Sequence, residues 1–177
     1  ANAKSVKVTA DKITVDVENT KTTTTSKTGS FGLELIKYEA GTDNTLAGAV
    51  FNVNIRNNAG AYIYAATGLV TNSNGKLEAT EGTRVIVGTS LEELAISKAG
   101  EVYTVEIEET AAPDGYDGIE GIITFTATSV ETEDRYVLEA KAEDTTIANA
   151  KSVEVTTDKI TVKVENTKTT TTSKTGS

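Results

Sequence analysis

Short runs of alternating apolar and polar residues dominate the chain. Alternation with a period of two is typical of strands that bury one face, because successive side chains of a strand point to opposite sides. The runs are rich in β-branched and aromatic residues, and turn signals such as Asn74-Gly75 and Asp114-Gly115 separate them. Many short strands of this kind predict an all-β sandwich. The expected strands cover residues 31–38, 49–55, 61–66, 84–89, 103–108, 122–128, 135–142 and 160–166.

Two segments call for separate predictions. In residues 89–97, TSLEELAIS, Ser90 is followed three positions later by Glu93, which is the pattern of a capping box. We therefore expect one short helix in this segment. Residues 152–166, SVEVTTDKITVKVEN, predict a terminal hairpin that turns at about residues 156–159.

The first 30 residues return almost unchanged at residues 148–177. Self-similarity at a fixed offset is typical of a tandem array of repeats. The two copies differ only at Lys7/Glu154, Ala10/Thr157 and Asp16/Lys163. The expected units are residues 1–21 as the C-terminal strands of a preceding repeat, 22–30 as a Thr-rich linker, 31–168 as the domain, and 169–177 as a second Thr-rich linker. A polar edge strand is the alternative interpretation of the Thr-rich tracts, since Thr is β-branched.

Composition narrows the range of functions. The 177 residues carry 17 Lys and Arg against 26 Asp and Glu, and the net charge of −9 argues against nucleic acid or an anionic membrane as a partner. There is no Cys, His or Trp, which excludes disulfides, thiolate zinc sites and the common Ser/His/Asp and Cys/His catalytic groups, and no cofactor is expected.

No apolar run reaches the roughly 18 residues of a membrane span, and no signal peptide is visible.

Three strands carry a polar residue where the alternation calls for an apolar one. For any one of them alone, a strand end that bends back to water is the simpler interpretation, because charged residues are seldom buried unless paired. Together, however, they supply an amine, a carboxyl and a carboxamide, which are the groups needed to form an amide bond between side chains. The three residues are Lys37 after Leu35, Glu109 after Ile107, and Asn166 after Val164.

The expected chemistry follows from burial. A dry site favours the neutral amine of Lys37 and the protonated form of Glu109. The amine would attack the carboxamide carbon of Asn166, while Glu109 would donate to the carboxamide oxygen and pass a proton to the departing ammonia. A fold that holds these groups in attack geometry can lower the barrier by roughly 7–11 kcal/mol. Phe51 or Tyr103 is expected to exclude water from the site.

Three stretches in the correct order resemble the Cna B-type domains of Gram-positive pilins and adhesins. ETAAPDGY at 109–116 resembles their Glu-containing E-box, and LELIKYEAGTDNTLAGAVFNV at 33–53 resembles their opening segment with its reactive Lys. ITVKVENTK at 160–168 resembles their closing strand with its reactive Asn. The resemblance implies a transthyretin-like, inverse immunoglobulin β-sandwich in which a spontaneous isopeptide bond, assisted by Glu109, joins Lys37 to Asn166.

The resemblance also bears on two other parts of the chain. Residues 55–100 match the family less well than the rest. Asn19, in ITVDVENTK, stands where the reactive Asn would stand in a preceding repeat, and its Lys partner is expected to lie in that repeat. The first hairpin is also a candidate to replace the closing strand, in its own or a neighbouring chain.

The expected function is therefore structural. A repeat whose first and last strands are joined covalently would suit the stalk of a cell-wall-anchored bacterial surface protein outside the cell, with adjacent repeats as its partners. The alternative is an adhesin module that binds a host or surface ligand through residues 55–100. An enzyme acting on external substrates has little support, because no phosphate loop or nucleophile elbow occurs and the internal reaction turns over once.

Overall fold

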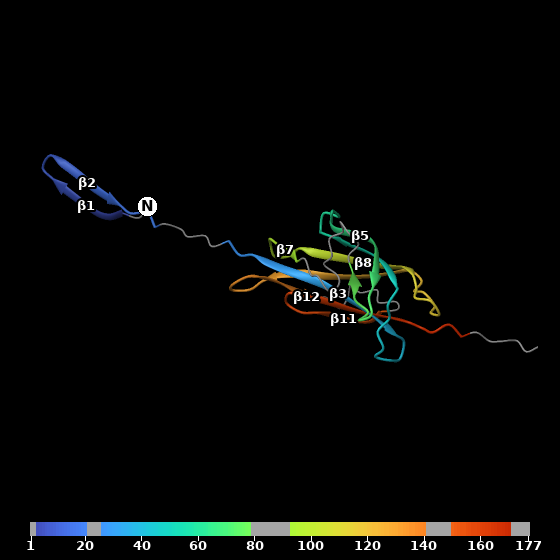
Figure 1. Ribbon diagram of the computed structural model, residues 1–177. Coiled ribbons are helices and arrows are strands. Elements are labelled where there is room, and N and C mark those ends of the chain that lie inside the picture. Colours follow the sequence, from blue (N-terminus) through green and yellow to red (C-terminus); the bar gives the residue numbers. More distant parts are fainter. Residues whose placement is uncertain (1–2, 21–25, 79–92, 141–149, 171–177) are drawn as a thin grey trace, which may run out of the picture.

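A computed structural model of the protein describes residues 3–20, 26–78, 93–140 and 150–170 (Figure 1). The described residues form strands and connecting loops without a helix, so none of them builds a helix that could cross a membrane. The expected strand at 84–89 lies outside the described residues. The strands are β1 (Ala3–Thr9), β2 (Lys12–Val17), β3 (Gly29–Glu39), β4 (Val50–Arg56), β5 (Tyr62–Thr71), β6 (Leu77–Glu78), β7 (Leu94–Ile96), β8 (Val102–Ala111), β9 (Ile122–Glu131), β10 (Tyr136–Ala140), β11 (Ala150–Val155) and β12 (Lys159–Asn166).

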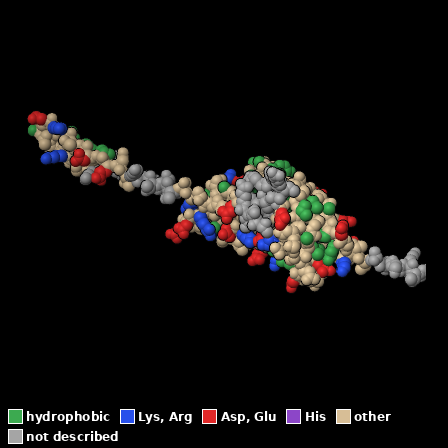
Figure 2. Space-filling view, viewed as in Figure 1, with side chains coloured by type: hydrophobic (Ala, Val, Ile, Leu, Met, Phe, Trp, Pro, Cys, Tyr) green, Lys and Arg blue, Asp and Glu red, His purple; other side chains and the backbone are tan. Residues whose placement is uncertain are grey.

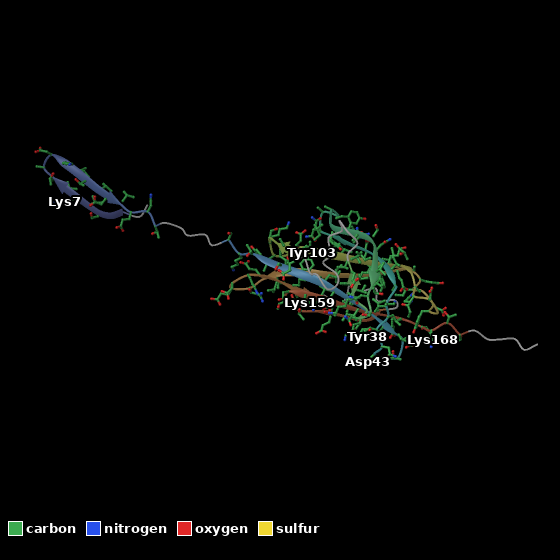
Figure 3. The ribbon with its side chains drawn as sticks, viewed as in Figure 1. Lys7, Tyr38, Asp43, Tyr103, Lys159 and Lys168 are labelled. Atoms are coloured by element: carbon green, nitrogen blue, oxygen red, sulfur yellow. The ribbon has the colours of Figure 1, made fainter. Side chains whose placement is uncertain are left out.

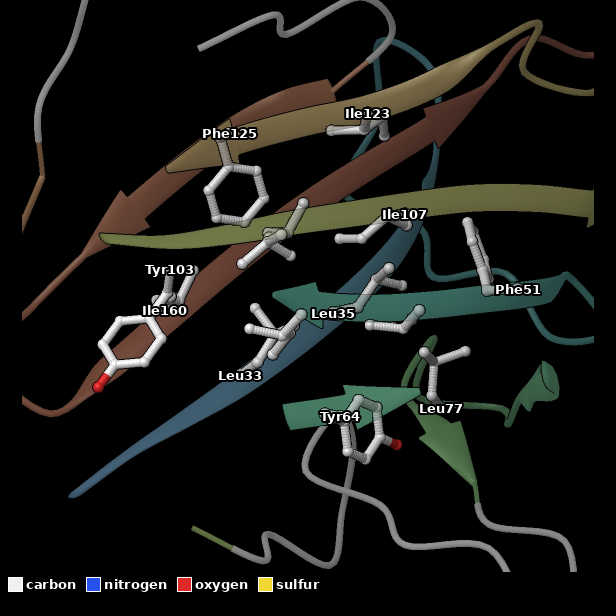
Figure 4. Packing of buried hydrophobic residues seen from close by; sticks show 14 of the residues in the cluster. Leu33, Leu35, Phe51, Tyr64, Leu77, Tyr103, Ile107, Ile123, Phe125 and Ile160 are labelled. Atoms are coloured by element: carbon white, nitrogen blue, oxygen red, sulfur yellow. The ribbon is translucent and has the colours of Figure 1, made fainter. Parts of the chain in front are cut away.

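Two sheets pack face to face and confirm the predicted β-sandwich. The larger has the strand order β10-β9-β8-β4-β5-β6, and the smaller has the order β11-β12-β3-β7. Alternate residues of each strand point into the space between the sheets, as Figure 4 shows for Leu33 and Leu35 of β3 and Ile107 of β8. The core consists of aliphatic and aromatic side chains from both layers, as the alternation predicted.

The first and last strands of the sandwich lie side by side. β3 and β12 pair in parallel, from Gly32 opposite Lys159 to Glu39 opposite Asn166. Parallel neighbours cannot be joined by a tight turn, and here almost the whole domain lies between them in sequence. The chain consequently enters the sandwich at one end and leaves it at the other (Figure 1).

The short helix expected in residues 89–97 is wrong in the part that the structure describes. Residues 94–96 form β7, which pairs antiparallel with the start of β3. Leu94 and Ile96 are buried while Ala95 is exposed, so the segment follows the period of a strand. Burying these two side chains outweighs the local capping signal, and Glu93 instead accepts a 2.6 Å hydrogen bond from Ser30 on β3. Ser90 lies outside the described residues.

Both copies of the repeated segment form antiparallel hairpins. The closing hairpin, β11 and β12, turns where predicted, with the N–H of Thr156 donating to the carbonyl of Lys159. The N-terminal hairpin, β1 and β2, forms a separate two-stranded sheet. Its β2 residues are all exposed.

Candidate functional site

The three predicted polar residues meet between the two sheets. Lys37 lies near the end of β3 and Asn166 ends β12. Because β3 and β12 are parallel and Lys37 lies opposite Val164, Lys37 and Asn166 are neighbours on the same face. Glu109 reaches the same place from β8 in the opposite sheet. The Lys37 and Glu109 side chains are 0% exposed, and Asn166 is 1% exposed.

Glu109 bridges the other two side chains. Its Oε1 lies 3.1 Å from Nζ of Lys37. Its Oε2 accepts a 3.0 Å hydrogen bond from Nδ2 of Asn166. The Lys37 contact has the distance of an ion pair, but its angles are not those of a hydrogen bond, and Nζ of Lys37 has no hydrogen-bond partner among the described residues. The amine is thus buried at ion-pair distance from the Glu109 carboxyl.

The loop after β8 fixes the carboxyl and the carboxamide through its backbone. The N–H of Ile119 donates to Oε2 of Glu109 at 2.8 Å, and the carbonyl of Asp117 accepts from Nδ2 of Asn166 at 2.7 Å. The predicted Asp114-Gly115 turn directs this loop over the site, with the N–H of Tyr116 donating to the carbonyl of Pro113. The sequence analysis did not predict these contacts, because residues of almost any type supply the same backbone N–H and carbonyl groups.

The orientation of the Asn166 carboxamide differs from the expectation. A backbone carbonyl can only accept, so the carboxamide nitrogen must face Asp117, and the same nitrogen then faces Glu109. The carboxamide oxygen Oδ1 is buried with no hydrogen-bond partner among the described residues. Oε2 of Glu109 therefore faces the carboxamide nitrogen, and the predicted donation from Glu109 to the carboxamide oxygen is not seen.

Burial of Lys37 disfavours its positive charge, and this effect outweighs the charges of its neighbours. Burial lowers the pKa of Lys37 below 10.5, although the negative charges of Glu109 and Glu165 oppose this shift. The ring of Phe51 lies 5.4 Å from Nζ and covers the amine, as predicted. Tyr103 packs instead against Phe31, with ring centroids 4.9 Å apart, and lies at the far end of the core from Phe51 (Figure 4).

The backbone of Lys37 is held on the side away from β12. Its N–H donates to the carbonyl of Gly75 at 2.8 Å, and its carbonyl accepts from the N–H of Leu46 at 3.0 Å. Gly75 has a φ of +72°, and a Cβ at this position would lie 2.4 Å from the carbonyl oxygen of Lys37. Only glycine fits this approach.

The site lies toward the end of the sandwich where the chain leaves it. Tyr38, which follows Lys37, and Lys168, just past Asn166, lie toward this end, whereas Lys159 lies farther back (Figure 3). The segment after Asn166 is held in place, because the N–H of Asp117 donates to the carbonyl of Thr167 and Tyr116 forms an isolated β-bridge with Lys168.

Asn19 is not part of this site. It follows β2 in the N-terminal hairpin and is exposed. Among the described residues, no group of three or more acidic side chains is arranged to hold a metal ion.

Solved structures similar to this chain include Gram-positive pilus proteins. The pilus adhesin SpaC from Lactobacillus rhamnosus GG, in its open conformation, is 20% identical with a TM-score of 0.45, over 82% of this chain and 15% of that one. The minor pilin GBS52 of Streptococcus agalactiae is 19% identical with a TM-score of 0.37, over 85% of this chain and 49% of that one. BcpA, the major pilin subunit of Bacillus cereus, is 18% identical with a TM-score of 0.32, over 79% of this chain and 29% of that one.

This chain spans less than half of each of these three chains. No family model matches the sequence, and no curated protein matches it. At these identities and TM-scores the likenesses decide nothing about function, which is argued below from the site itself.

Proposed function

We propose that this domain is a structural repeat of a Gram-positive cell-surface protein of the pilus or adhesin class, locked by an isopeptide bond between Lys37 and Asn166. One observation carries the proposal: a lysine amine and an asparagine carboxamide are buried against the two oxygens of one carboxyl group, Glu109. The desolvation of a buried Lys–Glu pair can cost more than its mutual attraction returns, so this pair is weak evidence for stability and indicates another task. Amide formation is a task that uses all three groups.

The reaction balances without a cofactor. Neutral Nζ of Lys37 attacks Cγ of Asn166, and a new C–N bond forms. Oε1 of Glu109, 3.1 Å from Nζ, takes up the proton that the amine loses. Oε2, 3.0 Å from Nδ2, is the side of the carboxyl from which a proton reaches the leaving nitrogen. The Cγ–Nδ2 bond breaks and ammonia departs, so the reaction occurs once per domain and the protein is not an enzyme in the usual sense.

A bond at this position would shield the domain from tension. Force on a tandem array enters at the start of β3 and leaves after the end of β12. A covalent link from Lys37 to Asn166 would pass the tension directly from β3 to the end of β12. The chain between these two residues, which includes the entire larger sheet, would carry none of it. Such a repeat resists extension without cysteine, which suits a stalk outside the cell.

Intact mass under denaturing conditions tests the proposal. The wild-type chain is expected to weigh one ammonia less than its sequence, whereas Lys37→Ala and the monomeric fraction of Asn166→Ala should have their full sequence masses. Glu109→Gln keeps the shape but cannot relay the proton, and it should leave most of the chain unbonded. A wild-type chain of full sequence mass would refute the bond.

A ligand-binding role through residues 55–100 is the second candidate. An open cavity of about 340 Å³ in this region favours it, with Asn57, Ile63, Leu94, Lys98, Glu101 and Tyr103 among its lining residues. However, Lys98 and Glu101 already pair with each other at 3.0 Å. Replacing both by Ala would test the role: reduced binding to host matrix proteins, with the isopeptide bond intact, would support a ligand site, and unchanged binding would refute it.

A further inference from the structure

The N-terminal hairpin presents an apolar stripe that nothing in its own sheet covers. Every large apolar side chain of the stripe is at least half exposed. A two-stranded hairpin is marginally stable in water, and an exposed stripe of this kind indicates a partner. Figure 2 shows the hairpin standing clear of the sandwich. The stripe consists of Val6 (60% exposed), Val8 (70%), Ile13 (69%), Val15 (50%) and Val17 (63%).

The closing hairpin shows what covers such a stripe. It has the same pairing register, with Val6 opposite Val15 in one copy and Val153 opposite Val162 in the other, and the same irregularity near its first residues. In the closing hairpin, however, Ile160, Val162 and Val164 are 0% exposed, because β12 pairs with β3 and faces the larger sheet.

The differences between the two copies spare this stripe. Lys7, Ala10 and Asp16 become Glu154, Thr157 and Lys163, and none of these positions belongs to it. Glu154 and Thr157 are exposed in the sandwich, and Lys163 is only partly buried. Nothing in the N-terminal copy would therefore prevent it from occupying the place of β11 and β12.

We infer that residues 3–19 are a docking element for a second copy of this domain, in which they take the place of the closing hairpin. With the register of β12 kept, Lys12 would lie opposite Gly32 of that copy and Asn19 opposite its Glu39. Asn19 would then stand beside that copy's Lys37 and Glu109, as Asn166 does here. This inference rests on the proposed function for its covalent step.

Chain length favours a second copy over the hairpin's own domain. In the register of β12, Asn19 would lie at the Glu39 end of β3, and the chain would have to return to Gly29 at the other end. That return covers about 33 Å at about 3.3 Å per strand residue. The ten residue steps from 19 to 29 reach at most about 33–36 Å when fully stretched. Only a taut linker could make the connection, whereas another copy is under no such constraint.

Each docking event would lead to a covalent bond between the two copies. Nζ of Lys37 in one copy attacks Cγ of Asn19 in the other, the Cγ–Nδ2 bond of Asn19 breaks, and ammonia leaves with the proton relayed by Glu109. In the wild-type chain Asn166 competes for the same Lys37 from within its own domain. In an Asn166→Ala chain the resident hairpin can no longer react, so even brief exchanges would accumulate as cross-links.

The test is refolding of full-length Asn166→Ala from denaturant at high protein concentration. We expect covalent dimers and larger species on denaturing gels, and a branched peptide joining Lys37 to Asn19 by mass spectrometry. Adding Asn19→Ala should abolish these cross-links. Asn166→Ser, which keeps a polar group near Asp117, replaces the Ala variant if that chain does not refold. A refolded chain that yields only monomer would overturn the inference.

A matched pair of variants separates docking from random collision. In the Asn166→Ala chain, Val15→Glu puts a charge on the apolar stripe and should abolish the cross-link. Asp16→Lys places on the other face the residue that the closing hairpin has at position 163, and cross-linking should persist. Equal cross-linking by both would show that the hairpin does not dock as β12 does. A wild-type chain that lacks one ammonia while Asn166→Ala stays monomeric would refute the docking and leave the proposed function standing.

Discussion

The two hairpins of this protein share nearly the same sequence and register but lie in different environments. In the N-terminal copy, Ile13 and Val15 are 69% and 50% exposed, whereas their counterparts Ile160 and Val162 are 0% exposed. Local sequence therefore sets the strands, the turn and the pairing of each hairpin. Burial, and with it any unusual chemistry, depends on what lies beside the hairpin.

The same contrast applies to the two asparagines. Asn166 is buried against Glu109 and Asp117, while Asn19 is exposed to water. A carboxamide in water is unreactive toward amines. On the proposed function, the β3 and β8 side chains around Asn166 are what would make it a cross-linking residue, whereas Asn19 in this chain is a surface residue.

Removing each asparagine in turn should give the largest contrast. Asn166→Ala removes the proposed bond, which would close most of the domain into a loop, and on the chain-entropy model used for disulfides this should cost about 5 kcal/mol of unfolding free energy. Asn19→Ala should leave the unfolding free energy of the sandwich unchanged. Denaturant titration followed by tyrosine fluorescence measures both, and equal stability of the two variants would contradict the comparison.

The same core substitution made in both hairpins should have unequal effects. Val162→Ala opens a cavity between the sheets and should destabilise the domain by about 2–3 kcal/mol. Val15→Ala changes an exposed side chain, and its effect should stay within about 0.5 kcal/mol. Thermal unfolding of the two variants gives the comparison directly. A large loss from Val15→Ala would mean that the first hairpin already packs against the sandwich.

A substitution outside both hairpins can disturb β3, the strand that pairs with β12 of the closing hairpin. Gly75→Ala would force a side chain into a positive φ and against the carbonyl of Lys37, 2.4 Å away. We expect a loss of about 2 kcal/mol and a slower formation of the bond, because Lys37 would shift. Gly60→Ala is the control, since Gly60 also has a positive φ but a Cβ added there would meet nothing within 4 Å. Similar bond yields in both variants would exclude a positioning role for Gly75.

The smallest expected effect is that of Glu34→Gln on the stability of the domain at acid pH. Burial alone would raise the pKa of Glu34, but its contacts with Lys159 and Lys76 hold it below 4.5. Because the folded pKa lies below the unfolded one, the stabilisation is present above pH 4.5 and is lost as the pH falls through the folded pKa. Glu34→Gln should cost about 1 kcal/mol at neutral pH and flatten the acid side of the stability profile. Parallel profiles for wild type and variant would rule out this contribution.

Sequence reasoning could predict those features that depend on alternation. Lys37 lies two positions after Leu35, and Asn166 two positions after Val164, so each shares a strand face with a buried apolar residue. This identifies an inward polar residue without knowledge of the rest of the fold. It could not predict the backbone groups of Asp117 and Ile119 that orient the site, because any residue type supplies them. It also failed at residues 94–96, where pairing with β3 outweighs a local helix signal.

The most direct test of the central claim is to digest the purified wild-type chain with a protease and sequence its branched peptides by tandem mass spectrometry. The account predicts one branched species, in which the peptide carrying Lys37 is joined to the peptide carrying Asn166 with the loss of one ammonia. Recovery of both peptides only in linear form, with Lys37 and Asn166 unmodified, would contradict it.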